Sequence, residues 1–374
     1  MLISTDSVKA LAKRIETADE VFCSGLFLSA RWFAVSQLDH DGFQMIVLPD
    51  KDSAEYCAAD LYNLIEGDRV FFLPDSGKTL ERSNYKSTLG VQRTSAIGKI
   101  IEYEEGKLIV VTYPSALEEG IPESGKIKES VLHLTVGDEI SHEAIVEAMF
   151  GNGFERVDFV AEPGQFAIRG AIVDIFSYSY NNPFRISFFG DEIDSISVFD
   201  CNTQLSKEKV HTAEIYPDIV ASEDEGSLSS ICSIIPDDAL IWLDSSDMYK
   251  NREFFKELEE YTRIYMELPL SRQDEDAIKF SISPQPVFSK NFELLTEDIR
   301  KRMDEGYRVR IYGEKQSQLE RLRSILSQNG NILPEFVSGC NIHNGFIDHE
   351  DKVCCYSDHE IFDRFHRVSI RRTV

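Results

Sequence analysis

The first 125 residues alternate between two patterns of hydrophobic and polar positions. Short apolar runs, which are typical of buried strands, flank a stretch whose apolar residues recur every three or four positions, as in a helix. The predicted strands are FQMIVLP (43–49), RVFFLP (69–74) and KLIVVTYP (107–114), and the predicted helix is SAEYCAADLYNLI (53–65). This order favours a mostly parallel sheet of the α/β class.

The middle of the chain has a different pattern. A strand, VLHLTV (131–136), and a helix, SHEAIVEAMFGNG (141–153), lead into a block rich in predicted strands. The α/β pattern then returns with the strand ALIWLD (239–244) and a charged helix, SSDMYKNREFFKELEEYT (245–262). Between these parts VASEDEGSLSS (220–230), which is acidic and rich in serine, is predicted to be a loop.

A smaller α/β pattern follows the segment PQPVF, which lies near residue 285. It consists of the helix NFELLTEDIRKRMDEG (291–306), the strand YRVRIYG (307–313), the helix QSQLERLRSILSQNG (316–330) and the strand KVCCYS (352–357). Gly330 is expected to end the second helix.

Along two segments of the middle block, side chains alternate between a more apolar face and a less apolar face. QFAIRGAIVDIF (165–176) alternates as one strand, in which Gly170 marks a bulge and Arg169 points to the less apolar face. PFRISFF (183–189) alternates too, and it places Arg185, Ser187 and Phe189 on one face.

An aromatic residue beside arginine, on a face turned away from the core, is typical of a protein-binding surface. If Arg169, Arg185 and Phe189 face solvent, replacing them should leave the fold intact. An alternative fits the pattern equally well: the two arginines pair with nearby acids, and Phe189 only covers the end of the sheet. The pattern leaves both interpretations open.

Composition limits the class of protein. The 374 residues predict two to four domains, and the net charge of −26 argues against binding nucleic acid through a general positive field. Seven scattered cysteines fit a reducing cytoplasm better than a disulfide framework. The start of the chain lacks a signal-peptide pattern, and the apolar stretch at residues 21–30 is too short to span a bilayer, so we expect no membrane contact.

Two segments resemble a phosphate-binding loop. Gly77-Lys78-Thr79 matches the end of such a loop, but Phe72 stands where its first glycine should be, so a chance turn is the better interpretation.

The second segment begins at Gly25, between a predicted strand and a predicted helix. Its spacing puts Ala30, Arg31 and Trp32 where a working loop has Gly, Lys and Ser or Thr. Trp32 cannot ligate Mg²⁺, so this is either a loop that has lost its chemistry or an ordinary strand–turn–helix.

Metal binding is not expected. The spacing of Cys340, His343, His349 and Cys354 matches no common zinc pattern. The carboxylates of GDEIDS (190–195) are expected at a solvated hairpin tip.

One block is specific enough to indicate a family. VAEPGQFAIRGAIVDIF (160–176), NPFRISFFGDEIDSISVFD (182–200) and TQLS (203–206) closely resemble the bacterial transcription-repair coupling factors, the Mfd family, in the segment that they share with the excision-repair protein UvrB. Looser similarity in the flanking segments extends the resemblance over essentially the whole chain.

The resemblance implies a multidomain α/β architecture. A degenerate P-loop-type α/β domain (1–125 and 216–283) would be interrupted by an inserted β-rich (α+β) domain (126–215) and followed by a small C-terminal α/β domain (284–374) of unknown role. In the family the inserted domain recruits UvrA, the damage-recognition ATPase of nucleotide excision repair.

The resemblance also implies roles for individual residues. The UvrA-binding residues of the family match Arg169, Arg185 and Phe189. Gly25 to Trp32 matches the place where UvrB keeps its working phosphate loop, so neither catalysis nor a cofactor is expected here.

The family's RNA-polymerase-binding and motor domains lie beyond the point where this sequence ends. We therefore expect a piece of a bacterial cytoplasmic ATP-dependent translocase, with RNA polymerase and DNA bound by other parts of the full-length protein. Two alternatives stay open: a nucleotide-hydrolysing UvrB-like repair protein, and a purely structural autoinhibitory module that forms no stable complex with UvrA.

Overall fold

The computed structural model describes residues 3–77, 83–180, 182–219, 228–272, 276–328 and 334–364, with only the backbone for residues 83–87. These residues form two compact units. The first unit comprises the described residues of 1–70, 105–114 and 237–371, and the second those of 71–104 and 115–236. The domain boundaries expected from the sequence remain a prediction.

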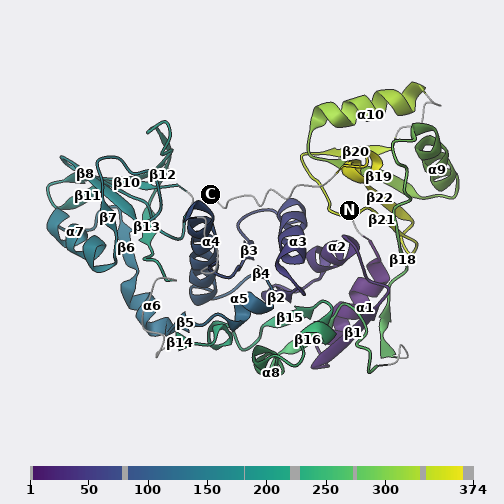
Figure 1. Cartoon of the computed structure of the whole chain (residues 1–374), viewed down its shortest axis with the longest axis horizontal. Coiled ribbons are helices and arrows are strands. Elements are labelled where there is room, and N and C mark those ends of the chain that lie inside the picture. The colour runs from purple at the N-terminus through teal and green to yellow at the C-terminus, as the bar shows by residue number, and fades with distance from the viewer. Residues whose placement is uncertain are drawn as a thin grey trace. The chain divides into compact units, whose positions relative to one another are not determined.

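A parallel sheet lies at the centre of the first unit (Figure 1). Its strands follow the order β17-β1-β16-β15-β2-β4, and every neighbouring pair is parallel. Every residue of β2, β4 and β15 is buried, as expected for apolar strands in a parallel sheet covered on both faces. The bounds are β1 Glu20–Ser24, β2 Phe43–Val47, β4 Leu108–Thr112, β15 Leu240–Leu243, β16 Thr262–Tyr265 and β17 Ile278–Lys279.

The pattern predictions for the first 125 residues are confirmed. The three strands are β2, β4 and β3 (Val70–Phe72), and the helix is α3 (Lys51–Leu64). The Asp50 side chain caps α3 by accepting a hydrogen bond from the Ser53 N–H at 2.8 Å. The other helices of this unit's N-terminal part are α1 (Thr5–Ile15) and α2 (Ala30–Gln37).

The charged helix predicted over residues 245–262 is confirmed only at Glu253–Leu258. The chain forms a 3-10 turn at Ser246–Met248, a short helix α8 (Glu253–Leu258), and then enters β16. The hydroxyl of Tyr249 donates to the backbone oxygens of Val47 at 3.1 Å and Asp244 at 2.8 Å. Tyr249 is thereby anchored against the ends of β2 and β15, and this tertiary contact overrides the local helical pattern.

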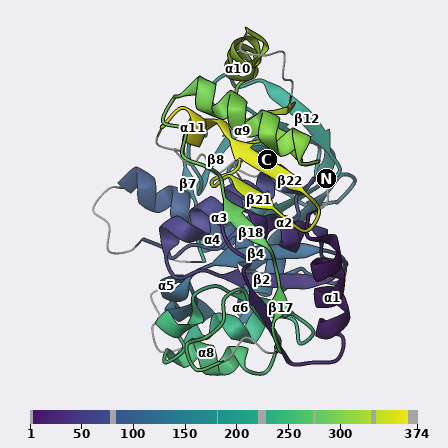
Figure 2. The ribbon, with the colours of Figure 1, turned by 90° about the vertical axis from the view of Figure 1, so that its right-hand side faces the viewer.

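The C-terminal part of the first unit has its own mixed sheet, in the order β18-β21-β22-β19-β20 (Figure 2). Leucine and isoleucine side chains of α9 and α10 pack with β19 and β22 in one buried cluster. The predicted helices and strands of this part are confirmed, and Gly330 lies outside the described residues. The bounds are β18 Ile282–Pro284, α9 Phe292–Asp304, β19 Arg308–Gly313, α10 Gln316–Gln328, β20 Glu335–Ser338, β21 Phe346–Asp348, β22 Val353–Ser357 and α11 Asp358–Ile361.

The turn between β21 and β22 binds the N-terminus of α1. Three of its carboxylates accept hydrogen bonds from the first backbone N–H groups of the helix, which lack partners within it. The bonds run from Ser4 N to Asp348 Oδ2 (2.7 Å), Thr5 N to Asp351 Oδ2 (2.9 Å), and Asp6 N and Ser7 N to Glu350 Oε1 (2.8 and 3.1 Å). Negative charge is favourable at this end of a helix, so the turn fastens α1 to the C-terminal sheet.

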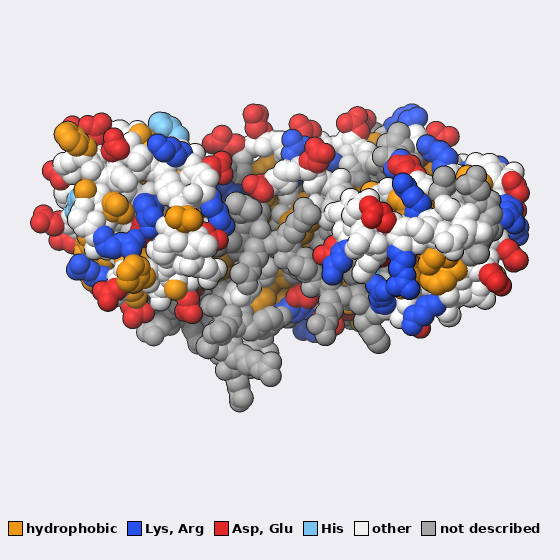
Figure 3. All heavy atoms as spheres, turned by 90° about the horizontal axis from the view of Figure 1, so that it is seen from above, with side chains coloured by type: hydrophobic (Ala, Val, Ile, Leu, Met, Phe, Trp, Pro, Cys, Tyr) orange, Lys and Arg blue, Asp and Glu red, His pale blue; other side chains and the backbone are white. Residues whose placement is uncertain are grey.

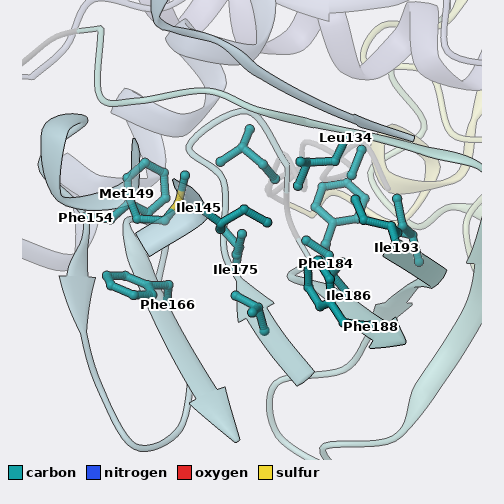
Figure 4. Packing of buried hydrophobic residues seen from close by; sticks show 14 residues of the cluster. Leu134, Ile145, Met149, Phe154, Phe166, Ile175, Phe184, Ile186, Phe188 and Ile193 are labelled. Atoms are coloured by element: carbon teal, nitrogen blue, oxygen red, sulfur yellow. The ribbon is translucent and has the colours of Figure 1, made fainter. Parts of the chain in front are cut away.

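The second unit is built around a six-stranded sheet in the order β12-β11-β10-β9-β8-β7. One face of this sheet and the helix α7 bury a shared cluster that includes Ile145, Met149, Phe166, Ile175 and Ile186 (Figure 4). The bounds are α7 His142–Gly151, β7 Glu155–Arg156, β8 Gln165–Arg169, β9 Ile172–Ile175, β10 Phe184–Phe189, β11 Glu192–Phe199 and β12 Ser206–Val210.

The remaining elements of this unit are helices and short strand pairs. Strand β6 (Leu132–Thr135) pairs with β13 (Thr212–Ile215), and β5 (Ile121–Pro122) pairs with β14 (Leu228–Ser229). Of the loop predicted over residues 220–230, residues 220–227 lie outside the described part. The helices are α4 Ser83–Ile101, α5 Pro114–Glu118 and α6 Ser124–Ser130, with a 3-10 turn at Ile231–Ile234.

The single strand predicted over residues 165–176 is wrong, because the segment forms the hairpin β8–β9. Gly170, with φ +62°, and Ala171 make a two-residue loop, and Arg169 pairs with Ile172. A glycine with positive φ at the first loop position is the arrangement of a type II′ turn. A single strand would have put Val173 on the face of Arg169 and Ile172 on the opposite face. The hairpin instead places Val173 on the core face and Ile172 on the face of Arg169.

The described residues contain neither a membrane-spanning helix nor a cluster of metal ligands. Among them no helix is long and apolar enough to cross a membrane. In the same part of the chain, no group of three or more His, Cys, Asp and Glu side chains is arranged to hold a metal ion.

Candidate functional site

Two hairpins, β8–β9 and β10–β11, place the three candidate partner-binding residues on one face of the second unit's sheet. Arg185 on β10 lies directly opposite Asp174 on β9, and Asp174 lies opposite Ala167 on β8. Arg169 is two residues further along β8, diagonal to Asp174 and within reach of its carboxylate. We call this side of the sheet, including Phe189, the arginine face.

Asp174 binds both arginines at once. Its side chain is fully buried, and it accepts hydrogen bonds from Arg185 Nε at 2.8 Å and Arg185 Nη2 at 3.0 Å, while Arg169 Nη2 also donates to it. The bond to the Asp174 carboxylate raises the pKa of Arg185, so this guanidinium stays charged.

Arg185 makes further contacts that fix its position. Its Nη1 donates to the backbone oxygen of Gln204 at 3.1 Å, and its Cζ lies 4.3 Å from the centre of the Phe199 ring. Its side chain is only 18% exposed. Replacement was expected to leave the fold intact only if the side chain faces solvent. Arg185 does not meet this condition.

Arg169 is the more accessible of the two. Its side chain is 35% exposed, and its Cζ lies 5.1 Å from the centre of the Phe159 ring. Phe159 is itself 63% exposed, so a charged group and an apolar ring are offered together to solvent.

Phe189 lies at the end of β10, where the loop Gly190-Asp191 turns the chain into β11. It is 81% exposed, whereas its neighbour Phe188 is buried in the core. The predicted alternation of Phe184, Ile186 and Phe188 with Arg185, Ser187 and Phe189 is confirmed by burial.

The structure tests one part of the second interpretation that the pattern left open, the pairing of the arginines with nearby acids. Both arginines do pair with a nearby acid, Asp174. Whether Arg169, Arg185 and Phe189 also bind a partner stays a prediction. Neither Asp174 nor Phe159 was predicted from the sequence.

Asp174 could have been found from the sequence once Gly170-Ala171 was recognised as a two-residue loop, because the register then puts it between the two arginines.

Basic groups are interspersed with acidic and hydrophobic ones in this region. Figure 3 shows the described side chains at the left of the view, where part of the second unit is seen, as a mixture of these kinds and not as a continuous basic surface. Such a surface suits a partner with a few matched groups better than a uniformly charged polymer.

The second candidate site, at Gly25, has the predicted order of strand, loop and helix. Gly25 follows β1 with φ +70°, and a Cβ at this position would lie 2.2 Å from the backbone oxygen of Phe280, so a side chain does not fit. Ala30 and Trp32, at the start of α2, are buried.

Arg31 is held within the protein. Its Nη1 donates to Asp244 Oδ2 at 2.5 Å and its Nε to the backbone oxygen of Leu28 at 3.2 Å. Asp244 follows β15 at the carboxyl edge of the parallel sheet, which is where such sheets bind ligands. Arg31 and Asp244 are therefore paired with each other at this edge of the sheet.

A buried acid lies behind the same loop. Asp60 accepts hydrogen bonds from the Ser29 hydroxyl at 2.6 Å and the His343 N–H at 2.8 Å, and burial raises the pKa of Asp60 to about 7. The Ser29 hydroxyl also accepts from the Asn344 N–H at 2.9 Å. These bonds join the start of α2 to the loop before β21.

Of the other phosphate-loop candidate, Gly77 is described with φ +65°, while Lys78 and Thr79 lie outside the described residues.

Comparison with known proteins first assigns a class of domain. Residues 132–219, which carry the arginine face, match the family described as UvrB interaction domain. The sheet β7–β12 and the helix α7 lie within this match.

A longer part of the chain is similar to transcription-repair-coupling factors. It is 31% identical to that of Mycobacterium tuberculosis over 209 residues, which are 52% of this chain and 16% of the relative. The Bacillus subtilis protein is 30% identical over 217 residues (57% and 18%), and the Escherichia coli protein 31% identical over 125 residues (33% and 11%).

The chain thus matches less than a fifth of the length of each of these relatives. The resemblance to the transcription-repair coupling factors is confirmed over about half of this chain, and residues 132–219 match the UvrB interaction domain family.

Proposed function

We propose that this chain is the part of a transcription-repair coupling factor that recruits UvrA, and that it does so with the arginine face. The observation that carries the proposal is a coincidence of position: Arg169, Arg185 and Phe189 lie together on one sheet face inside the UvrB interaction domain. The names of the relatives support a role in transcription-coupled repair, and we place that role in the bacterial cytoplasm.

The chemistry of the face supports a protein partner that presents carboxylates. Two guanidinium groups are held beside one buried carboxylate, so one positive charge remains uncompensated. Phe159 supplies exposed apolar area beside that charge, and Phe189 supplies more at the end of β10. Aromatic residues and arginine are the groups that most often dominate protein–protein binding energy.

We further propose that the chain acts without catalysis of its own. Arg31, at the position of the phosphate-loop lysine, is engaged by Asp244, while Ala30 and Trp32 are packed in the interior. This arrangement speaks against the alternative of a nucleotide-hydrolysing UvrB-like protein. Contacts with RNA polymerase and DNA are assigned to other parts of the full-length protein.

The test is a titration of the whole chain with purified UvrA by calorimetry, beside the variants Arg169→Ala and Phe189→Ala. We expect the parent to bind, and Arg169→Ala to weaken binding by roughly 30-fold, the scale for truncating one partner of a desolvated charge pair. Phe189→Ala should weaken binding without changing its salt dependence, since it removes area and no charge.

Two results would contradict the proposal. A parent chain that does not bind UvrA would favour the purely structural module. Variants that bind as tightly as the parent would place the contact on another surface.

A further inference from the structure

Asp174 is the buried group that links the two arginines, and the proposed function gives it no role of its own. It accepts hydrogen bonds from both guanidinium groups and is inaccessible to a partner protein. Resting on the proposed function, we propose that Asp174 is the positioning residue of the UvrA-binding surface, and that Phe159 is a further contact residue of that surface.

Asp174 holds the guanidinium groups of both arginines through hydrogen bonds. Arg185 binds Asp174 through two nitrogens, and Arg169 binds it through one. A free arginine side chain has several rotatable bonds, and ordering such a side chain opposes binding. A buried carboxylate at the fixed register of β9 orders both guanidinium groups before the partner arrives.

The negative charge of Asp174 allows a positioning role to be distinguished from a purely electrostatic one. Asp174 neutralises part of the positive charge of the arginine face, so a purely electrostatic surface would bind an acidic partner more tightly without it. A positioned surface would bind that partner more weakly without it. The variant Asp174→Asn separates the two, since it raises the local charge and removes the carboxylate.

Phe159 is assigned to the binding surface because its ring contacts Arg169. Its ring lies under the guanidinium at 5.1 Å and is 63% exposed, although Arg169 and the next residue in the chain, Val160, are more buried. A partner carboxylate that reaches Arg169 would come close to this ring. The same ring limits the directions that Arg169 can take.

Phe150 provides a matched control. It is also an exposed phenylalanine, at 55%, but it lies on α7 and packs edge-on against Phe166 at 5.3 Å, on the core side of the sheet. Its replacement removes a similar exposed area from the opposite face.

The experiment measures the affinity of the whole chain for purified UvrA at two salt concentrations, for the parent and the variants Asp174→Asn, Phe159→Ala and Phe150→Ala. Hydrogen exchange of residues 165–190 is followed in parallel to establish that the hairpins stay folded. We expect Asp174→Asn to weaken binding about tenfold, the loss for two side chains that must be ordered on binding. Phe159→Ala should weaken it at least about fivefold with an unchanged salt slope, and Phe150→Ala should bind like the parent.

Each outcome tests either the positioning role of Asp174 or the contact role of Phe159. A folded Asp174→Asn chain that binds as tightly as the parent, or more tightly, overturns the positioning role. Phe159→Ala with parental affinity, or Phe150→Ala with an equal loss, overturns the contact role of Phe159. If Asp174→Asn unfolds the hairpins, Asp174 is required for the fold itself, so this result also overturns the positioning role, and the comparison of the two phenylalanines still decides the contact role of Phe159.

The experiment distinguishes a failure of the proposed function from a failure of this inference. A parent chain that does not bind UvrA overturns both. A parent that binds, with Arg169→Ala weakened and the Asp174 and Phe159 variants unaffected, overturns this inference alone.

Discussion

Replacing Arg185 by alanine should destabilise the second unit more than replacing Arg169. The change removes two hydrogen bonds to the buried Asp174 carboxylate, at 2.8 and 3.0 Å, and one to the Gln204 backbone oxygen at 3.1 Å. It also leaves Asp174 Oδ1 without the donor that it has in the parent.

The magnitude follows from the burial of the pair. Breaking a fully buried ion pair by removing one partner costs about 3–5 kcal/mol, and hydrogen bonds to charged groups contribute about 1.5–3 kcal/mol. Arg169 remains to share the charge, and Arg185 is 18% exposed, so both effects are reduced. We expect a loss of about 2–4 kcal/mol for Arg185→Ala and about 1 kcal/mol for Arg169→Ala, whose side chain is 35% exposed.

The assay must report on the second unit alone. Both tryptophans of the chain, Trp32 and Trp242, belong to the first unit, so tryptophan fluorescence follows the wrong part. Hydrogen exchange of the amides in β9 and β10 measures the local opening free energy directly. The double variant Asp174→Ala with Arg185→Ala should lose less than the sum of the single changes, because no unpaired carboxylate is left behind.

Equal losses for Arg185→Ala and Arg169→Ala would refute the reasoning. So would additive effects in the double variant, since they would mean that Asp174 and Arg185 do not stabilise one another.

Three further expectations concern the rest of the chain. The chain should show no ATP binding by calorimetry at micromolar protein, because Arg31 is engaged by Asp244; binding that is abolished by Arg31→Ala would contradict this. Duplex DNA should bind weakly at physiological salt, because residues 126–215 carry seven Lys and Arg against fifteen Asp and Glu; submicromolar affinity with a steep salt slope would be the opposite result. Burial raises the pKa of Asp60 to about 7, so its folded form holds a proton more tightly than the unfolded chain, and stability should fall as pH rises from about 4 through 7. Asp60→Asn should show a smaller fall than the parent in thermal unfolding over this range, and an unchanged profile would count against the buried acid.

The sequence predicted elements better than it predicted their pairing. Apolar runs such as residues 43–49 and 107–114 became strands because a parallel sheet buries both of their faces. The loop Gly170-Ala171 was missed because most residues on both sides of it are apolar, which hides the one-residue shift in alternation that a two-residue turn causes. The error mattered, since the face of every later side chain in the hairpin depends on that turn.

Contacts between distant segments were beyond the reach of local patterns. The carboxylates of residues 348–351 bind the first N–H groups of α1 across more than 340 residues of sequence. Tyr249 likewise ended a charged, periodic stretch by bonding to the end of β2. Neither contact has a signature within its own segment, so only the folded chain reveals them.

The arginine face combines a structural role with a proposed binding role, and this affects how variants must be interpreted. Because Arg185 is tied to Asp174, Gln204 and Phe199, its loss disturbs the sheet on which Arg169 is presented. Loss of UvrA binding by Arg185→Ala would therefore not identify a contact. Phe189 and Phe159 are free of this ambiguity because most of each side chain is exposed, and Asp174→Asn avoids it through the sign of its effect. A variant that gains positive charge, keeps its fold and still loses affinity for an acidic partner can be explained only by geometry.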